Sequence, residues 1–344
     1  MSGSSHDGVD IAYCEFVQKK GNWSYTVPLS ITYDYSESWK NKLKNVYGAS
    51  ARELAWLDNE YGMFLGKILS VFIRESKIKP DFIASHGHTI FHQPDNHFST
   101  QIGKGAPIAS LTKLPVINDF RSTDMAKGGQ GAPLVPIGDK LLFSDYDFCL
   151  NLGGIANISF DDYDGSRVAF DIAPCNMGLN YIAAQKNKTF DDDGKLARKG
   201  KVDMTLLEQL NSLDYYWTSG AGSLGREWFE KYIVPLLNRS QISPEDKLAT
   251  FTEHVAYQIG RIVAQYPGHS LLITGGGAYN SYLVERIKEA VTLEVNIPEQ
   301  TTIDFKEAII FAFLGVLRKR EETNILKTVT GASSDSVGGV VWLP

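Results

Sequence analysis

The chain has 344 residues, of which 43% are hydrophobic, and its formal net charge is −6. This length predicts two domains with ample core, and the acidic balance gives no support for binding to nucleic acids or to an anionic membrane surface. No apolar run approaches the ~20 residues of a membrane span, and the first residues lack the features of a signal peptide. The cysteines Cys14, Cys149 and Cys175 are scattered without metal-binding spacing, which predicts a reducing cytoplasmic location.

The first predicted elements are a small, polar, glycine-containing segment over residues 1–10 and two strands over 10–17 and 23–33. A glycine turn between strands recurs over residues 151–171, so one module occurs twice. Chain termini are usually flexible, but the repeated module of a glycine turn and strands argues against a flexible tail at residues 1–10.

The elements between and after the two modules follow from periodicity and turn residues. A duplicated β-meander followed by helix-strand units predicts two similar lobes around a cleft, each aiming a glycine-bearing hairpin into it. A nucleotide held in this way needs no Walker-type loop, and the sequence contains none. The expected elements are helical segments within 36–75, strands at 81–85, 98–103 and 115–120, a loop over 122–138, helices over 244–266, 279–291 and 305–320, and an irregular end over 327–344.

The stretch from residue 151 to residue 176 carries the clearest chemical signal. Gly153 and Gly154 allow a backbone to approach a ligand with bare amides, which suits phosphate oxygens. Asp171 ends an apolar strand just before Pro174, so its carboxylate can face a cleft and act as a base. The alternative is an ordinary β-meander with a surface aspartate.

Several motifs, taken together and in this order, resemble one family, the anhydro-N-acetylmuramic acid kinases, which are bacterial sugar kinases of the actin-like ATPase fold. The motifs are the segment 1–10; 86–94, with His86 and His92; 118–122, followed by Asp124 and 128–133; 151–157; Phe170-Asp171 with Pro174 and Asn176; 223–227; 275–280; and Glu307-Ala308.

The resemblance implies an α/β, two-lobed actin-like (ribonuclease H-like) fold with a duplicated mixed β-sheet and helices around a central cleft. Residues 1–144 plus 305–344 would form lobe I, with the first phosphate loop and the sugar-binding loop. Residues 145–304 would form lobe II, with the second phosphate loop and the adenosine site.

The implied activity is an ATP-dependent reaction of cell-wall recycling. The enzyme opens 1,6-anhydro-N-acetylmuramic acid with water and phosphorylates O6, giving N-acetylmuramic acid 6-phosphate. Asp171 matches the family's catalytic base, and Glu307 matches a second carboxylate. Mg²⁺ would accompany ATP, with Asp7 as the candidate that holds it, through water.

The resemblance also implies the ligand contacts. The predicted nucleotide-binding residues are Gly3, Ser4, Ser5, His6, Asp7, Gly8, Val9, Asp10, Asn151, Gly153, Gly154, Gly275, Gly276, Gly277 and Asn280. The predicted sugar-binding residues are Asn118, Asp119, Arg121, Gln130 and Asn176, and Arg121 suits the lactyl carboxylate by charge. The expected partners are therefore ATP and an amino sugar, without nucleic acid or membrane, in a possible homodimer.

Some positions depart from the family pattern. Ser4-Ser5 stands where threonine is usual at the second position, His88 replaces glutamine, Gly222 replaces lysine, and residues 172–175 lose a hydroxyl and two glycines beside the base. The family also has an apolar strand before the first phosphate motif; we expect either a start upstream of Met1 or a lobe without that core strand.

Two other classes of function stay open at this point. One is a nucleotide- or sugar-binding protein of the same fold with little catalysis, or a kinase for a different amino sugar. The other is a metallohydrolase built on His86, His88 and His92, with His97 nearby; this would need the i, i+4 pair to lie on a helix, whereas Thr89-Ile90 favours extended chain.

Overall fold

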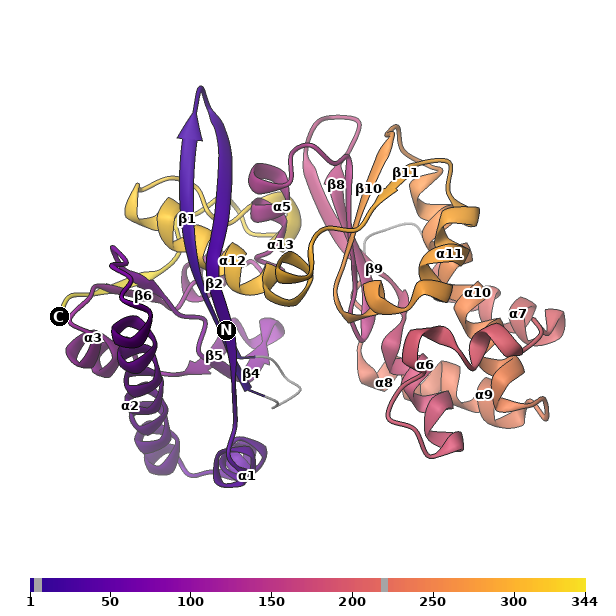
Figure 1. Cartoon of the computed structure of the whole chain (residues 1–344), viewed down its shortest axis with the longest axis horizontal. Coiled ribbons are helices and arrows are strands. Elements are labelled where there is room, and N and C mark those ends of the chain that lie inside the picture. Colours follow the sequence, from indigo (N-terminus) through magenta and orange to yellow (C-terminus); the bar gives the residue numbers. More distant parts are fainter. Residues whose placement is uncertain (3–7, 218–221) are drawn as a thin grey trace. The chain divides into compact units, whose positions relative to one another are not determined.

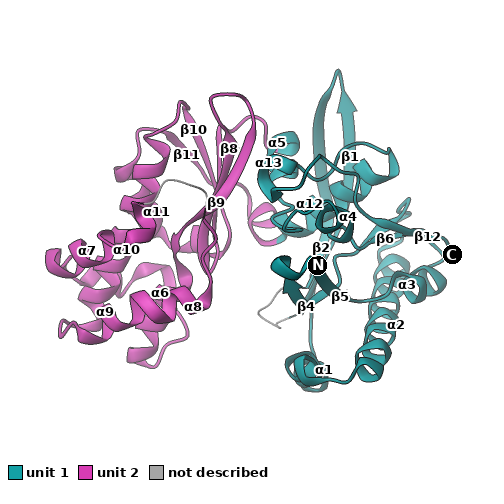
Figure 2. Ribbon diagram, turned by 180° about the vertical axis from the view of Figure 1, so that it is seen from behind, with its two compact units in different colours: residues 1–142, 305–344 teal, residues 143–304 magenta. Residues whose placement is uncertain are grey.

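The computed structural model describes residues 1–2, 8–217 and 222–344. The chain forms two compact units: unit 1 is Met1–Leu142 with Phe305–Pro344, and unit 2 is Phe143–Asp304 (Figure 2). Each unit combines strands with helices, which confirms the predicted α/β class. No helix in the described ranges is long and apolar enough to cross a membrane.

Unit 1 begins with a long antiparallel hairpin, the indigo pair of strands in Figure 1. The pairing of β1 (Gly8–Lys19) with β2 (Asn22–Asp34) runs from Gly8 opposite Asp34 to Lys19 opposite Asn22. The connection has positive φ at Lys20 (51°) and Gly21 (90°), the backbone that a tight hairpin with right-handed strand twist requires. This hairpin confirms the two strands predicted at the start of the chain.

The core of unit 1 is organised by the 26-residue helix α2 (Ala51–Ser76). Ser50 and Glu53 form a capping box at its start, which satisfies amide groups that a helix end leaves free. Its buried face carries Tyr61 and Leu65, and Gly66 lets α3 (Gly105–Thr112) pack close, since an added Cβ would lie 2.7 Å from Leu111.

The remaining elements of unit 1 form two small sheets and five helices among the described residues. In the three-stranded sheet, β6 is central, parallel to β3 and antiparallel to β12. The bounds are β3 (Ile83–Ala84), β4 (His88–Gln93), β5 (Phe98–Ile102), β6 (Val116–Asn118), β12 (Val340–Trp342), α1 (Glu37–Asn45), α4 (Ser122–Ala126), α5 (Pro136–Leu142), α12 (Gln300–Lys319) and α13 (Lys327–Thr330).

Three predictions about these elements are wrong. The expected loop over 122–138 contains α4 and the start of α5, and the expected irregular end contains α13 and β12. Helix α12 begins five residues before the predicted position 305, because Thr302 and Ile303 are buried although their neighbours are polar. Glu307 therefore lies in the third turn, where the helix dipole favours an acidic residue little.

Unit 2 is built on one five-stranded sheet in the order β11-β10-β7-β8-β9. The strands β7 (Phe148–Leu152), β8 (Ile155–Asp161) and β9 (Arg167–Pro174) form an antiparallel meander, and β10 (Ser270–Thr274) and β11 (Glu294–Asn296) continue it in parallel with β7. This strand order confirms the predicted ribonuclease H-like fold class in unit 2. The described strands of unit 1 form separate sheets of two, three and two strands, so the predicted duplication of the sheet is not complete there.

Helices pack on the sheet of unit 2 and bury its apolar residues. The largest is α10 (Pro244–Val263), whose Leu248, Phe251 and Ile259 are fully buried in the same cluster as Phe148 and Leu150. The other helices are α6 (Asn176–Ala183), α7 (Met204–Asn211), α8 (Arg226–Trp228), α9 (Val234–Arg239) and α11 (Ser281–Ala290). A rigid sheet is thus available to position side chains at the ends of β7, β8 and β9.

Candidate active site

A row of polar side chains crosses three neighbouring strands of unit 2. Asn151 on β7 lies opposite Asn157 on β8, and Asn157 lies opposite Asp171 on β9. Directly opposite residues share one face of a sheet, with Cβ atoms roughly 5 Å apart. All three are half-buried although the sheet around them is apolar, so the row brings two amides and one carboxyl to a partly desolvated surface.

The carboxyl group of Asp171 is held by the chain that follows η6, a short helical turn at Asp214–Tyr216. The Leu224 N–H donates to Oδ2 over 2.8 Å, and the Ser223 hydroxyl donates to the same oxygen over 3.5 Å. The Asp171 N–H donates to the Gly222 oxygen, and the Tyr215 hydroxyl donates to the Asp171 oxygen over 2.6 Å. These contacts fix both the backbone and the carboxylate of Asp171.

Burial raises the pKa of Asp171 above its ordinary value, and the hydrogen bonds from Leu224 and Ser223 oppose that rise. A carboxylate with a raised pKa binds a proton more readily than an exposed aspartate. Asp171 is therefore suited to accept a proton from a reacting group.

Two glycine turns meet beside this row. Thr274 at the end of β10 pairs with Asn151 at the end of β7, so the turn at residues 153–154 and the turn at residues 275–277 lie side by side. Gly275 has φ +81°, and an added Cβ would lie 2.5 Å from Oδ1 of Asn151. The backbone here comes so close that only glycine fits, which leaves bare main-chain surface for a ligand.

The predicted ligand residues Asn176 and Asn280 both form hydrogen bonds with the backbone of the two glycine turns. The Asn176 side chain donates to the Leu152 oxygen over 3.0 Å, and its main-chain N–H donates to the Gly153 oxygen over 3.1 Å. Asn280 caps α11 by accepting from the Leu283 N–H over 3.0 Å. Asn176, predicted to bind the sugar, thus lies in unit 2 among residues predicted to bind nucleotide. The capping role of Asn280 agrees with the preference for asparagine directly before a helix.

In unit 1, the described part of the first phosphate motif joins β1. The Met1 ammonium group donates to the Asp10 oxygen over 2.7 Å, and the Asp10 N–H donates to the Met1 oxygen over 2.8 Å. Gly8 and Val9 belong to β1, and the Val9 side chain is buried in the core, so Val9 can offer a ligand only its backbone. The predicted residues Gly3, Ser4, Ser5, His6 and Asp7 lie outside the described residues.

Glu307 is electrostatically coupled to this N-terminal pair. Desolvation raises the pKa of Glu307, while the Met1 ammonium and the Arg121 guanidinium lower it. Asp10 opposes these cations and raises that pKa further. Unit 1 therefore brings together two predicted site carboxylates, Asp10 and Glu307, and the predicted sugar residue Arg121.

The guanidinium of Arg121 lies against His86. Arg121 Nη2 donates to His86 Nε2 over 2.8 Å, and Nη1 donates to the Gly131 oxygen over 2.6 Å. Burial and the Arg121 charge hold the pKa of His86 well below its usual range, so His86 is a neutral acceptor. The Nε of Arg121 is buried and has no hydrogen-bond partner among the described residues.

The rest of the predicted sugar loop is organised by buried Asp124. Asp124 accepts from the Gly131 N–H over 2.8 Å and from the Thr330 hydroxyl over 2.7 Å, and this holds residues 128–133 in place. Gln130 is exposed at the loop surface, with its main-chain N–H donating to the Thr330 oxygen.

Asn118 and Asp119 are occupied within unit 1. Asn118 accepts from Trp342 Nε1 over 2.9 Å, and Asp119 accepts from the Ser122 hydroxyl over 2.6 Å. Both residues therefore shape the start of the sugar loop, and each would have to share or exchange these bonds to contact a sugar.

The histidine cluster does not assemble into a metal site. His86 pairs with Arg121, His88 Nδ1 with the Ser2 hydroxyl at 2.9 Å, and His92 with Ser99. His88 and His92 lie on strand β4, so their spacing does not place them on one helical face. No group of three or more potential metal ligands occurs in the described ranges. These separate partners give the metallohydrolase alternative no support.

Sequence reasoning did not select Asn157, Tyr215, Ser223 or Leu224 as site residues. Asn157 lies in the motif at 151–157, and Ser223 and Leu224 lie in the motif at 223–227, so these two motifs could have indicated that the three residues belong to the site. Tyr215 stands outside those motifs, and only the tertiary contact with Asp171 identifies it.

Comparison with known proteins supports the assignment of these residues to one family. The family model described as "Anhydro-N-acetylmuramic acid kinase" matches residues 1–344. A relative with that name from Pseudomonas syringae pv. tomato is 35% identical, and the match covers 99% of this chain and 97% of the relative. Another, from a Sulfurovum species, is 33% identical, and the match covers 100% of this chain and 98% of the relative.

Solved structures with some likeness include an activator of 2-hydroxyisocaproyl-CoA dehydratase from Clostridium difficile with bound ADPNP. It is 15% identical, with a TM-score of 0.38, and the match covers 66% of this chain and 89% of the activator. A glucokinase of the ROK family from Streptomyces griseus is 9% identical, with a TM-score of 0.33, and the match covers 83% and 94% of the two chains. The full-length sequence match confirms the predicted resemblance, and the chain belongs to the anhydro-N-acetylmuramic acid kinase family.

Proposed function

We propose that this protein opens 1,6-anhydro-N-acetylmuramic acid with water and phosphorylates O6 at the expense of ATP, giving N-acetylmuramic acid 6-phosphate. The observation that carries the proposal is the polar row that ends at Asp171, a carboxyl group with a raised pKa and fixed orientation. Family membership supplies the substrate class.

In this reaction Asp171 accepts a proton from the attacking water. The water oxygen forms a bond to C1 of the sugar, and the C1–O6 bond breaks. The freed O6 then bonds to the γ-phosphorus of ATP, the bond from that phosphorus to the bridging oxygen breaks, and ADP leaves. The proton on Asp171 is released to solvent. A base held by Leu224 and Ser223 is preorganised for the first step, since no reorientation is needed.

The glycine turns at 153–154 and 275–277 supply backbone surface for the nucleotide, and Asn151 lies between them. Arg121 is the proposed partner for the lactyl carboxylate, because its resonance-stabilised guanidinium retains its charge and can pair with a carboxylate. The neutral His86 keeps Arg121 in place without adding a competing positive charge.

Mg²⁺, when bound with ATP, would neutralise charge on the phosphate oxygens. The carboxylates of Asp10 and Glu307 are oxygen ligands of the kind that Mg²⁺ prefers, and the group of charges in unit 1 is consistent with such a site. Asp7 remains a proposed water-mediated ligand outside the described residues.

The stretch at 172–175 departs from the family pattern, but it still contacts the glycine turn at 153–154. Ile172, Ala173 and Cys175 are buried, and the Cys175 N–H donates to the Gly154 oxygen over 2.8 Å. Residues 172–175 therefore hold the turn at Gly153-Gly154 in place, although they lack the two glycines of the family pattern.

The test is a phosphoryl-transfer assay with Mg-ATP and 1,6-anhydro-N-acetylmuramic acid, with the product read by mass. We expect a product heavier than the sugar by one water and one phosphoryl group. N-acetylmuramic acid serves as the control substrate, because it has no anhydro bond to open. A product that gains the phosphoryl group without water, or transfer to other amino sugars only, would contradict the proposal.

A further inference from the structure

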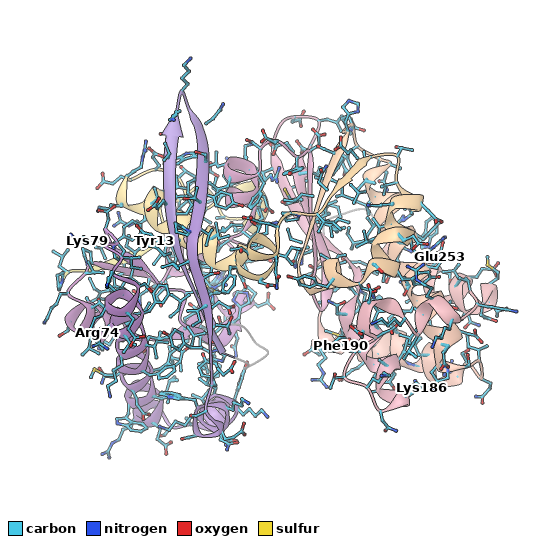
Figure 3. All side chains as sticks on the ribbon, viewed as in Figure 1. Tyr13, Arg74, Lys79, Lys186, Phe190 and Glu253 are labelled. Atoms are coloured by element: carbon cyan, nitrogen blue, oxygen red, sulfur yellow. The ribbon has the colours of Figure 1, made fainter. Side chains whose placement is uncertain are left out.

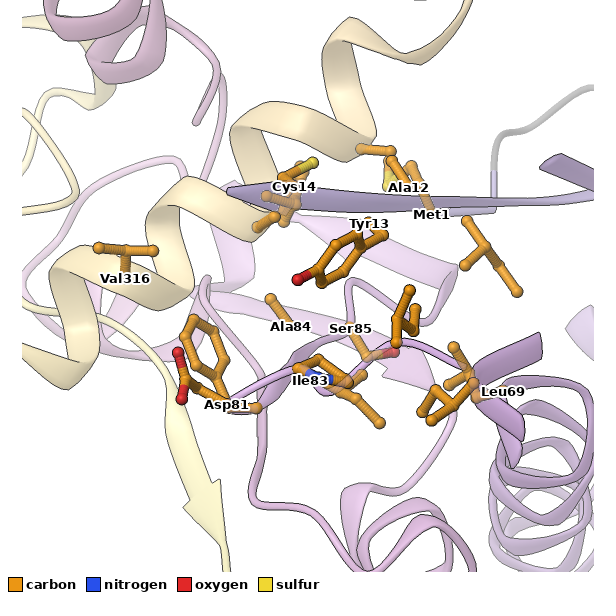
Figure 4. A pocket seen from close by; sticks show the side chains of 18 of the residues that line it. Met1, Ala12, Tyr13, Cys14, Leu69, Asp81, Ile83, Ala84, Ser85 and Val316 are labelled. Carbon is orange, nitrogen blue, oxygen red and sulfur yellow. The ribbon is translucent and has the colours of Figure 1, made fainter. Parts of the chain in front are cut away.

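The interiors of the two units contain different features. Unit 1 has a cavity of about 690 Å³ beside β1, with Tyr13, Ile83 and Val316 in its lining (Figure 4). In unit 2, polar side chains lie at the apolar core where α7, α10 and the turn η6 meet. Burial of polar groups costs free energy unless each finds a hydrogen-bond partner. These polar side chains are Asn211, Tyr216, His254 and Gln258.

The four side chains form one continuous hydrogen-bonded network. The Tyr216 hydroxyl lies 3.0 Å from His254 Nε2, and His254 Nδ1 lies 2.7 Å from Asn211 Oδ1. Gln258 Nε2 also donates to Asn211 Oδ1, over 2.9 Å. Because Asn211 Oδ1 can only accept, His254 carries its proton on Nδ1, and its Nε2 accepts from the Tyr216 hydroxyl. Burial lowers the pKa of His254 to about 3, so the ring is neutral near pH 7 and keeps this single arrangement.

The network holds the turn η6 from the side of α10. His254 lies in the middle of α10, and Asn211 is the last residue of α7, so the bonds start from two regular helices. Trp217, directly after η6, is held as well, because its Nε1 donates to the Asn211 main-chain oxygen over 2.9 Å. Tyr216 and Trp217 are therefore both fixed by the helices that pack behind the turn.

Tyr215, the residue before Tyr216 in η6, reaches β9 instead of α10. Its hydroxyl donates to the Asp171 main-chain oxygen over 2.6 Å. The ring centroids of Tyr215 and Tyr216 are 5.5 Å apart in a close-packed interior, so a displacement of one ring is transmitted to the other. The chain after η6 supplies the Leu224 N–H that donates to the Asp171 carboxylate. One short turn thus connects buried His254 to the proposed base.

We propose that the His254–Tyr216 hydrogen bond positions the Asp171 carboxylate by fixing η6. The fixed turn keeps the Tyr215 hydroxyl on the Asp171 oxygen and the Leu224 N–H on the carboxylate. His254 is fully buried in the core, so it is a positioning residue and acts through η6. Dispersion contacts alone would not fix the direction of the Tyr216 side chain, whereas a hydrogen bond requires a defined angle. The inference rests on the proposed role of Asp171 as the base.

The pKa of Asp171 reports whether its carboxylate is held. Burial raises this pKa, and the hydrogen bonds from Leu224 and Ser223 lower it. Tyr215 also faces Asp171, but burial and the Asp171 charge raise the pKa of its hydroxyl, so Tyr215 stays protonated while the carboxyl titrates. If η6 is loosened, the bond from Leu224 weakens, and the pKa of Asp171 rises further.

The experiment compares Tyr216→Phe, which removes only the hydroxyl, with Thr252→Val as the matched control. Thr252 lies two residues before His254 on α10 and is also fully buried, but its hydroxyl donates to the Leu248 oxygen of the same helix over 2.8 Å. Each variant loses one buried hydroxyl, so both should lower the midpoint of urea denaturation. His254→Phe, which removes the acceptor and keeps a ring, is a second variant of the pair.

The pKa of Asp171 is measured in the full chain without substrate, by carbon NMR of labelled aspartate carboxyl groups, with Asp171→Asn to identify the signal. We expect Tyr216→Phe and His254→Phe each to raise this pKa by about 0.5 or more. Thr252→Val should leave it unchanged.

Steady-state kinetics with Mg-ATP and 1,6-anhydro-N-acetylmuramic acid provide the second measurement. Tyr216→Phe should lower kcat several-fold with an unchanged KM for ATP, because the nucleotide surface at the glycine turns is not altered. In a Tyr215→Phe background, Tyr216→Phe should have little further effect on kcat, since the connection through Tyr215 is already lost.

An unchanged Asp171 pKa in both variants of the pair, or an equal rise in Thr252→Val, would overturn the proposal. Fully additive losses of kcat in Tyr215→Phe and Tyr216→Phe would overturn it too. If the parent protein forms no phosphorylated product, the proposed function has failed, and the NMR titration still decides whether His254 and Tyr216 position the carboxylate.

Discussion

The hydroxyl of Tyr215 donates a hydrogen bond of 2.6 Å to the main-chain oxygen of Asp171, and it also reaches the Gly222 oxygen at 3.2 Å. One side chain therefore joins strand β9 to the segment whose Leu224 N–H binds the Asp171 carboxylate. Figure 3 shows the side chains of the described residues as sticks, with Lys186, Phe190 and Glu253 labelled in unit 2. The relationship connects the position of the proposed base to a residue outside the family motifs.

Tyr215→Phe should lower kcat several-fold, because the segment that holds the Asp171 carboxylate loses its brace. The expected stability loss is about 1 kcal/mol, the net contribution of one hydrogen bond. Tyr163→Phe is the matched control, since its hydroxyl also donates to a main-chain oxygen, that of Gln265, but on an exposed hairpin. Urea denaturation and steady-state kinetics separate the two effects; equal kcat losses in both variants would contradict the bracing role.

Asp171→Asn should reduce kcat by about 100-fold or more, because an amide cannot accept the proton of the attacking water. The Asn oxygen can still accept from the Leu224 N–H, so we expect the fold and the affinity for ATP to stay nearly unchanged. Asp164→Asn in the exposed hairpin is the control and should keep full activity. Normal turnover by Asp171→Asn would show that another group is the base.

The pH dependence of the reaction should report the raised pKa of Asp171. A base must be ionised, so log(kcat/KM) should rise with pH on an acid limb whose midpoint lies above the ordinary aspartate pKa of about 3.9. Ser223→Ala removes a hydrogen bond that lowers this pKa, so the limb should move to higher pH. A limb that moves to lower pH in Ser223→Ala would contradict the assignment.

The same raised pKa should cost stability. Below the unfolded-state pKa of about 3.9, the Asp171 carboxyl is protonated in both the folded and the unfolded state and does not change the free energy of unfolding. As the pH rises from there toward the folded-state pKa, the unfolded chain loses its proton first, so the free energy of unfolding falls. Asp171→Asn should therefore have a higher Tm than the parent protein at pH 7, and the gain should disappear near pH 3.

Asp147→Asn provides a control of opposite sign. The His269 N–H and Ser270 lower the pKa of Asp147, so its stabilisation is present above the unfolded-state pKa and is lost as pH falls through the folded-state pKa. Asp147→Asn should thus have a lower Tm at pH 7. Shifts of Tm in the same direction for Asp171→Asn and Asp147→Asn would contradict the opposite pKa shifts of the two carboxyl groups.

Gly275→Ala should raise the KM for ATP. Its φ of +81° disfavours a side chain, and the new Cβ would press on Asn151 and Leu152 between the two glycine turns. Gly165→Ala has a similar φ, +73°, with nothing within 4 Å, so it isolates the backbone strain of about 1–2 kcal/mol from the contact. Both variants should lose stability, but only Gly275→Ala should change the KM; a similar KM change in both would refute the nucleotide contact.

The sequence by itself determined the glycine turns, a strand that carries Asp171, and the family, because these depend on local residue order and on motif spacing along the chain. The predicted end of that strand at Asp171 is wrong: β9 continues to Pro174, because Ile172 and Ala173 pack in the core of unit 2. The hairpin at 8–34 and the helix at 244–263 also follow from local periodicity and turn residues.

Only the tertiary structure decided which polar groups meet. Strand register places Asn157 between Asn151 and Asp171, and a contact across 44 residues places Tyr215 at Asp171. Local patterns do not encode such contacts, since register is set by packing of the whole face. The raised pKa of Asp171 likewise arises from desolvation by residues distant in sequence, so only the folded unit creates it.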